Sequence, residues 1–211
     1  MAKKEKGTDA RRAQFIETAG ALFFSKGYNG TSIRDILDAM GGSVNSPSVF
    51  YYYFKSKDDI YQAVLKGHTD RYIAALEDCV RDERREPLAM IADILQVFIR
   101  AMRVRTFSRE AAEESLNNKM FNAYLLAEIE KKGAEIWEQI IFALPWTSGT
   151  RAESRRTAAF LNGGIGALTR EYSESGGDAA ELVEQIIDLC SDVMHAPESE
   201  RARFKRMLSS M

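Results

Sequence analysis

The chain has 211 residues, 45% of them hydrophobic, and a formal net charge of −2. This length allows one large domain or two small ones around a buried core. Because no apolar run approaches the roughly 18 residues of a membrane span, and the charged N-terminus lacks the apolar stretch of a secretory signal, we expect a cytoplasmic protein with no membrane partner.

Charge is distributed unevenly along the chain. Residues 1–66 hold ten Lys and Arg against seven Asp and Glu, so this part carries +3 and the remainder −5. The overall charge does not favour nucleic-acid binding, whereas a basic N-terminal part joined to an acidic body is compatible with it. Charge alone does not decide whether the protein binds nucleic acid.

Apolar residues recur at spacings of three and four between the helix breakers, which predicts an all-α fold of about nine helices. The first helix is expected over about 9–26. Ser32 begins the second and forms a capping-box pattern with Asp35. Ser46, followed by a proline, supplies an N-cap hydroxyl for the third helix, and Ser56 caps the fourth.

The rest of the chain predicts further helices with the same periodicity. Their expected ranges are about 87–105, 109–117, 119–144, 152–173 and 178–195, with a short helix in the tail after Pro197.

Three short helices in the first 55 residues, the last two joined by a turn that contains glycine, match the helix-turn-helix pattern. In that motif the second helix of the pair enters the major groove of DNA, and here it would run from Ser46 to about Tyr52. We therefore divide the chain into a DNA-binding domain, 1–57, and a ligand-binding and dimerisation domain, 58–211. The candidate DNA contacts are Thr31, Asn45, Ser46, Ser48, Tyr51, Tyr52, Tyr53, Lys55 and Lys57.

The stretch "SPSVFYYYFKSKDD" suggests why aromatic and basic residues are crowded together there. Phe50 and Phe54 have the spacing of a face that packs inward. The three tyrosines between them could offer hydroxyls to phosphate oxygens while their rings remain partly packed. Lys55 and Lys57 follow at the start of the next helix, where amide dipoles and ammonium groups together attract a phosphate.

Two segments, "ALFFSKGYNGTSIRDIL" and "SVFYYYFKSKDDIYQAVL", resemble the N-terminal domain of TetR-type transcriptional regulators. The resemblance covers about 11–65 and includes a Phe-x-x-x-Gly-Tyr run, a Thr-Ser pair before an Ile-x-x-Ile helix, and an aromatic segment that ends in Phe-Lys-Ser-Lys. It implies a homodimer that binds a palindromic operator in double-stranded DNA and represses transcription. A small molecule bound in the C-terminal domain would release it.

The sequence departs from the family pattern in one place. Between Ile36 and the first tyrosine of the aromatic run it is about three residues longer, through "GGSVN". Either Val44 still fills the small core while the glycines bulge outward, or the recognition helix is re-aimed. The second case leaves open a helical sensor or scaffold with weakened or altered DNA binding. A three-helix domain that never touches DNA, and an N-terminal lysine-rich tail that is either disordered or a minor-groove arm, also remain open.

The middle of the chain suggests a cavity for a small apolar ligand, although for each residue taken singly a place in an ordinary core is the favoured interpretation. The candidate ligand contacts are His68, Phe98, Met102, Phe107, Met120, Phe121, Tyr124 and Trp137.

The last two long helices indicate a dimer surface. Each carries an apolar stripe, and glycines at 163, 164 and 166 would let a partner helix approach closely, so two copies could form a four-helix bundle. The stripes could also serve only the core of a single chain. The stripe on the helix over 152–173 also contains Phe160. The expected interface residues on the two stripes are Leu161, Ile165, Leu168, Tyr172, Ile186, Leu189 and Val193.

The sequence gives no support for an enzyme. It contains no nucleophile-elbow motif, no phosphate-binding glycine loop after a strand, and no Cys/His spacing of a metal site, so we expect no catalytic residue, metal or cofactor. The two cysteines, Cys79 and Cys190, lie far apart in amphipathic patterns, which indicates buried free thiols.

Overall fold

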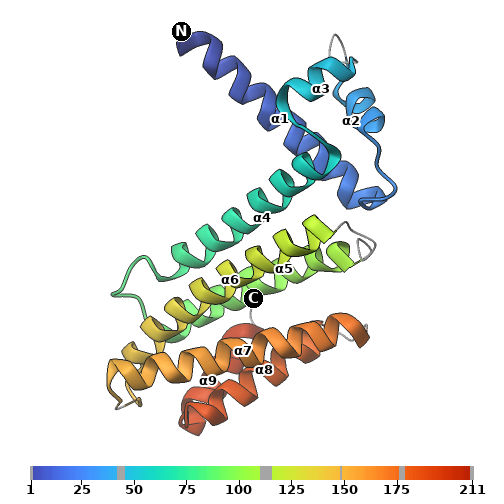
Figure 1. Ribbon diagram of the computed structural model, residues 1–211. Helices are drawn as coiled ribbons and strands as arrows, with labels where there is room; N and C mark the ends of the chain where they lie inside the picture. Colours follow the sequence, from blue (N-terminus) through green and yellow to red (C-terminus); the bar gives the residue numbers. More distant parts are fainter. Residues whose placement is uncertain (1, 42–45, 110–115, 148, 176–178, 210–211) are drawn as a thin grey trace. The chain divides into compact units, whose positions relative to one another are not determined.

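The computed structural model describes residues 2–41, 46–109, 116–147, 149–175 and 179–209, and every regular element within them is an α-helix (Figure 1). The expected all-α fold is therefore confirmed, with nine helices in the described part of the chain. In chain order these are α1 (Ala2–Lys26), α2 (Ile33–Met40), α3 (Pro47–Tyr53), α4 (Lys57–Val80), α5 (Pro87–Arg109), α6 (Leu116–Ala143), α7 (Arg151–Ser175), α8 (Ala179–Val193) and α9 (Glu198–Ser209).

The largest difference from the expected helix boundaries is at the start of the first helix. α1 begins at Ala2 rather than near residue 9, because the Ala, Lys and Glu residues at positions 2–6 have high helix propensity. The lysine-rich start of the chain is thus helical in this structure. Of the helix expected over 109–117, residues 110–115 lie outside the described residues.

The chain divides into two compact units, each with its own hydrophobic core. The N-terminal unit comprises Met1–Asp70 and Val104–Leu125, and the C-terminal unit comprises Arg71–Arg103 and Leu126–Met211. The N-terminal unit therefore continues along α4 past residue 57 and includes the first turns of α6. None of the described helices combines the length and the apolar character needed to cross a bilayer.

Side-chain caps define the starts of two helices in the N-terminal unit. Ser32 Oγ accepts a hydrogen bond from the Asp35 amide at 3.1 Å, and Asp35 Oδ2 accepts from the Ser32 amide at 2.7 Å, so the expected capping box is present. Ser56 Oγ likewise accepts from the Asp59 amide at 3.1 Å before α4. Both carboxylates also lie in the first turn, where the helix dipole favours negative charge.

The expected side-chain cap of α3 is wrong. Ser46 holds the N-cap position with an extended backbone, but its hydroxyl makes no cap hydrogen bond within the described part of the chain. It lies 3.3 Å from the Ser48 hydroxyl instead. α3 is only seven residues long, so its order depends on the packing of its aromatic side chains more than on capping.

That packing centres on Phe15 of α1. The ring centroid of Phe15 lies 6.1 Å from those of both Phe50 and Phe54, in edge-to-face geometry, and 5.5 Å from that of Tyr53. Phe15, Phe50 and Phe54 are all buried, as expected for the two α3-region phenylalanines. α2 packs against both α1 and α3 and closes the other side of this core (Figure 1).

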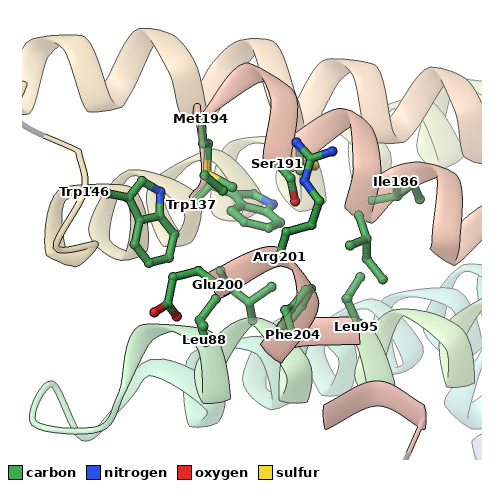
Figure 2. A pocket seen from close by; sticks show the side chains of 14 residues that line it. Leu88, Leu95, Trp137, Trp146, Ile186, Ser191, Met194, Glu200, Arg201 and Phe204 are labelled. Atoms are coloured by element: carbon green, nitrogen blue, oxygen red, sulfur yellow. The ribbon is translucent and has the colours of Figure 1, made fainter. Parts of the chain in front are cut away.

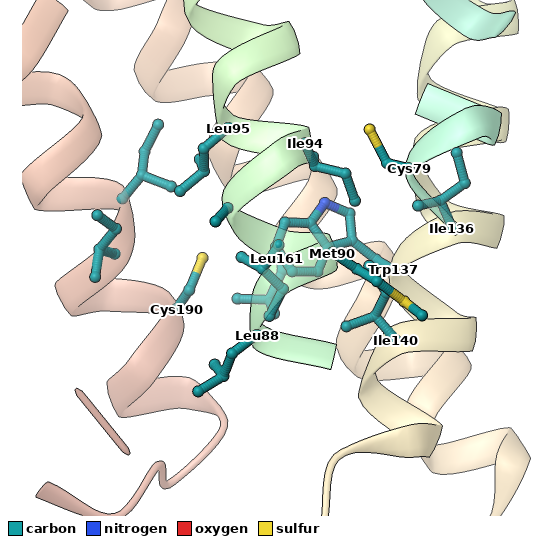
Figure 3. Packing of buried hydrophobic residues seen from close by; sticks show 14 of the residues in the cluster. Cys79, Leu88, Met90, Ile94, Leu95, Ile136, Trp137, Ile140, Leu161 and Cys190 are labelled. Carbon is teal, nitrogen blue, oxygen red and sulfur yellow. The ribbon is translucent and has the colours of Figure 1, made fainter. Parts of the chain in front are cut away.

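The C-terminal unit is built from α7, α8 and α9, most of α5, the longer part of α6 and the C-terminal part of α4. Figure 3 shows Trp137 of α6 among Met90 and Ile94 of α5, inside a continuous apolar cluster. Phe204 brings α9 into the same cluster. α9 is further attached by ion pairs, of Arg203 with Glu86 and of other basic residues with α8.

Both cysteines belong to this cluster, and both are free and buried, as expected. Burial raises the pKa of the Cys190 thiol to about 12. It also raises the pKa of Cys79, whose sulfur lies 3.1 Å from the Ala75 carbonyl oxygen. Neither thiol is therefore poised as a nucleophile.

Candidate nucleic-acid interface

The outer side of α3 is exposed and polar, although its inner side is fully buried. Tyr52 is 72% exposed and Tyr51 is 56% exposed. Phe50, which faces the core, is completely buried. Ser46 and Ser48, at the start of the helix, are exposed as well. The alternation follows from the helical period, because residues three to four apart share a face.

The tyrosine rings are braced from below. Tyr51 makes an edge-to-face contact with Phe50, and Tyr52 makes one with the half-buried Tyr53, whose ring in turn contacts Phe15. Each ring thus has a packed flank while Tyr51 and Tyr52 remain largely open to solvent. Such side chains can present a hydroxyl to a phosphate at little cost in side-chain entropy.

Three cations lie at the C-terminal end of α3. Lys55 is exposed and follows the helix directly. The Arg12 guanidinium of α1 lies 5.0 Å from the centroid of the Phe54 ring. Arg12 was not among the expected contacts, because only the fold brings α1 beside this end of α3.

Lys57, the third cation, is held against an aromatic ring. Its ammonium lies 4.0 Å from the centroid of the Tyr28 ring, a cation–π arrangement. Burial lowers the pKa of Lys57, and the nearby carboxylates of Asp58 and Asp35 act in the opposite direction. The contact with the Tyr28 ring thus holds the Lys57 ammonium at the start of α4.

A partly buried polar network starts at Asp58, the residue after Lys57. The Tyr28 hydroxyl donates to Asp58 Oδ1, and the Asn118 side-chain amide donates to the same oxygen at 2.9 Å. Asn118 is completely buried, and its own oxygen accepts from Gln62 Nε2 at 2.9 Å. Sequence reasoning did not find this network, since a single Asn on a helix carries no pattern that distinguishes it.

Two of the expected DNA contacts need separate comment. Thr31 is buried, and its hydroxyl donates to the Gly27 carbonyl oxygen at 2.8 Å. It closes the turn after α1, where Gly27 has a φ of 75°, and we correct its assignment from a DNA contact to a turn residue. Asn45 lies outside the described residues, as does Val44.

The expected ligand contacts do not come together in one unit. Phe98 and Trp137 belong to the C-terminal unit, whereas His68, Met120, Phe121 and Tyr124 belong to the N-terminal unit. Met120 is 66% exposed and Tyr124 is also exposed. His68 packs edge-to-face on Phe24 at 4.7 Å. The side chains of Met102 and Phe107 lie outside the described residues.

Among the expected ligand contacts whose side chains the structure describes, only Trp137 lines the apolar pocket shown in Figure 2, which lies in the C-terminal unit. That pocket lies between α5, α6, α8 and α9. In the part of the chain that the structure describes, no group of three or more His, Cys, Asp or Glu could hold a metal ion.

The expected dimer residues separate into core and surface. Leu161 and Ile186 are buried in the core of the C-terminal unit, so their assignment to an interface is corrected. Ile165, Leu168 and Tyr172 are partly buried against the same core. Among the side chains of these helices that the structure describes, the large apolar ones that are exposed are Phe160, Leu189 and Val193.

Glycines open the surface of α7 beside Phe160. A Cβ placed on Gly163, Gly164 or Gly166 would have no atom of the described chain within 4 Å. The glycines are therefore not required for packing inside one chain. They leave bare backbone next to an exposed phenylalanine, where another helix could approach closely.

Comparison with known proteins agrees with this geometry. Residues 15–64 match the model described as "Bacterial regulatory proteins, tetR family". The transcriptional repressor KstR2 of Rhodococcus jostii is 23% identical over 92% of this chain and 95% of its own.

Two solved structures share the fold. A TetR-family regulator from Mesorhizobium loti matches with a TM-score of 0.63 and 18% identity, over 89% of this chain and 95% of that one. The regulator FadR of Bacillus subtilis, solved in complex with stearoyl-CoA, matches with a TM-score of 0.52 and 14% identity, over 87% of this chain and 95% of that one.

Proposed function

Since the chain belongs to the TetR family of bacterial transcriptional regulators, which are DNA-binding proteins and not enzymes, we propose that it is a repressor that binds a palindromic operator as a homodimer. A small apolar molecule bound in the C-terminal unit releases it. The protein acts in the cytoplasm, where its operator is accessible.

The observation that carries the proposal is the two-sided character of α3. Its buried side is fixed by Phe50 and by the adjoining Phe54, and its outer side exposes two serines and two tyrosines. Two large aromatic rings exposed next to each other on one short helix are typical of an interaction surface. With Lys55 and Arg12 at the end of the helix, the face has the side chains that contact bases and phosphates in a major groove.

Homodimerisation is supported by the exposed apolar residues of α7 and α8. Phe160 is 68% exposed, and the open glycines on the same helix permit close approach of a partner. A two-fold dimer would present two copies of α3, which matches the symmetry of a palindromic operator.

Ligand control is supported by the pocket of the C-terminal unit and by the relative FadR, which was solved with stearoyl-CoA bound. A ligand releases DNA only if it binds more tightly to a form of the dimer that cannot contact both halves of the palindromic operator. Such a difference in binding free energy is typically ~1–3 kcal/mol.

Selection of bound sequences from random duplex DNA tests the proposal. We expect enrichment of a two-fold symmetric sequence whose half-sites are spaced by about one helical turn or a multiple of it. Affinity for the selected duplex should fall steeply with salt. As a matched control, the double variant Tyr51→Ala, Tyr52→Ala alters only exposed positions and should fold normally but lose the enrichment. Failure of the wild-type chain to enrich any sequence would favour a helical sensor or scaffold instead.

A further inference from the structure

The pocket of the C-terminal unit is an apolar recess with a few polar atoms in its wall. Its empty volume is about 450 Å³ when the open space at its mouth is included. Leu88 and Leu95 of α5, Trp137 of α6, Ile186 of α8 and Phe204 of α9 supply apolar surface (Figure 2). α9 is the last element of the chain to contribute, so the site is complete only when this helix is packed.

Two hydrogen-bond donors in the wall of this pocket are buried and lack an acceptor. Nε1 of Trp146 and Nε of Arg201 both have no hydrogen-bond partner among the residues that the structure describes. Both residues line the pocket, and the Arg201 side chain extends from α9 toward Ser191 of α8 (Figure 2). A buried N–H group without an acceptor has lost its hydrogen bonds to water and gained none in return, which costs free energy. Each of these donors therefore favours a bound molecule that supplies an acceptor oxygen.

The charges around the pocket are already balanced. The terminal Nη2 of Arg201 donates to Asp192, and this hydrogen bond is the main reason why the pKa of Arg201 is raised. Glu200, which also lines the pocket, lies 3.5 Å from Arg203. A carboxylate in the pocket would meet a guanidinium that is already paired and a second carboxylate beside it. An uncharged acceptor meets no such repulsion.

Two other basic residues of α9, Arg203 and Lys205, are paired outside the pocket. Arg203 donates to Glu86 at 2.8 Å, and Lys205 lies 2.7 Å from Asp188. These pairs hold α9 against α5 and α8 and leave no cation of α9 that the structure describes in the pocket except Arg201.

We propose that this pocket binds an uncharged, mainly apolar molecule that carries carbonyl oxygens, with Trp146 Nε1 and Arg201 Nε as the donors that recognise them. The binding itself does not depend on the proposed repressor function. Its consequence, that this class of molecule is what releases the operator, rests on that function.

The sequence provides a direct probe of the pocket. The chain contains two tryptophans, Trp137 and Trp146, and both line it. Titrating the full-length protein with 2-octanone, a small methyl ketone, should therefore give a saturable change in tryptophan emission. Octanoate, of similar length but charged, should bind at least about tenfold more weakly at pH 7.

Two variants test the donors. Trp146→Phe keeps an aromatic ring without the N–H, and Arg201→Lys keeps the charge without Nε. We expect one or both to weaken 2-octanone binding by about three- to tenfold, the effect of losing one hydrogen bond. Trp137 still reports binding in the first variant. Arg206→Lys, on an exposed position of the same helix, is the matched control and should bind like the wild type.

The outcomes separate clearly. Octanoate binding as tightly as the ketone would overturn the assignment of an uncharged ligand. Unchanged ketone affinity in both donor variants, or no saturable change up to the solubility limit, would overturn the site. If 2-octanone binds as expected but leaves DNA affinity unchanged, the site stands and its regulatory role fails. Absence of any sequence-specific DNA binding instead refutes the proposed repressor.

Discussion

Asn118 of α6, which is completely buried, donates a hydrogen bond at 2.9 Å to Asp58 of α4, 60 positions away in the sequence. Asp58 is the residue after Lys57, and Tyr28, whose ring holds the Lys57 ammonium, donates to the same carboxylate oxygen. The start of α6 is thus joined through one carboxylate to a cation that we propose contacts DNA. A change in the position of α6 would reach Lys57 through these contacts.

The first prediction concerns this network. Asn118→Leu should lower the free energy of unfolding by about 1–3 kcal/mol, because it removes the acceptor of Gln62 Nε2 and one of the donors to Asp58 Oδ1 at a fully buried position. Urea unfolding followed by circular dichroism measures this. Gln14→Leu, on the exposed side of α1, is the control and should change stability by less than about 0.5 kcal/mol. The loss of unfolding free energy in the double variant Asn118→Leu, Tyr28→Phe should differ from the sum of the two single losses. Strict additivity would show that the two residues act separately.

The second prediction concerns Lys57. Lys57→Gln should weaken specific and non-specific DNA binding alike and reduce the slope of log affinity against log salt by about one, the effect of one lost phosphate contact. Titrations at several salt concentrations give the slope. Lys55→Gln is the comparison, since Lys55 is exposed and, among the described residues, its ammonium does not lie over an aromatic ring as that of Lys57 does. A changed base preference with an unchanged slope would contradict the phosphate assignment.

The third prediction separates the two sides of the aromatic run. Phe54→Ala should destabilise the N-terminal unit by ~3–5 kcal/mol, because the ring is buried against Phe15 and Phe50. Tyr52→Phe keeps the exposed ring and should leave the melting temperature unchanged while reducing DNA affinity by one hydrogen bond. Thermal melts and binding curves on the same samples distinguish these effects. Equal stabilities of the two variants would refute the division into core and contact residues.

The fourth prediction concerns the dimer. Phe160→Glu combined with Leu189→Glu should produce folded monomers with reduced operator affinity, since both side chains are exposed and neither is needed for the core of one chain. Sedimentation velocity measures the mass, and circular dichroism confirms the fold. Leu161→Glu is a useful contrast, because burial of Leu161 predicts unfolding rather than clean dissociation. Dimers that persist in the double variant would place the interface elsewhere.

The fifth prediction concerns pH. Burial raises the pKa of Cys190 from the ordinary 9.0 to about 12, so the folded state holds the thiol proton more tightly than the unfolded state. The resulting stability is fully present below pH 9 and is lost as the pH rises toward 12. Cys190→Ala should therefore show a shallower loss of stability over this window than the wild type, in denaturant unfolding at each pH. Identical slopes would mean that Cys190 is not buried in solution.

Local patterns predicted the elements of this fold better than the contacts of its sites. The capping box at Ser32, the cap at Ser56 and the burial of Phe50 and Phe54 follow from spacing within a few residues, and the structure has all of them. The same kind of reasoning put the Ser46 hydroxyl in a cap, where it bonds Ser48 instead. Short-range rules identify a helix start but not which of several acceptors a hydroxyl will choose.

The errors in the candidate sites come from long-range packing. An apolar stripe on a helix has the same appearance whether it faces its own core or a partner, so Leu161 and Ile186 could not be separated from Phe160 by periodicity. Arg12 and Asn118 reach their partners only through tertiary contacts, and the pocket brings together residues from four helices. None of these contacts leaves a mark in a single sequence.

The separation of α3 into a buried side and an open side affects how readily its specificity can change. Ser46, Ser48, Tyr51 and Tyr52 contribute little to the core that holds the helix in place. A library randomised at these four positions should therefore consist mostly of folded proteins. Operator preference could drift during evolution, or be redesigned, without a matching loss of stability. New specificities would then be limited by which bases the side chains can reach rather than by whether the protein folds.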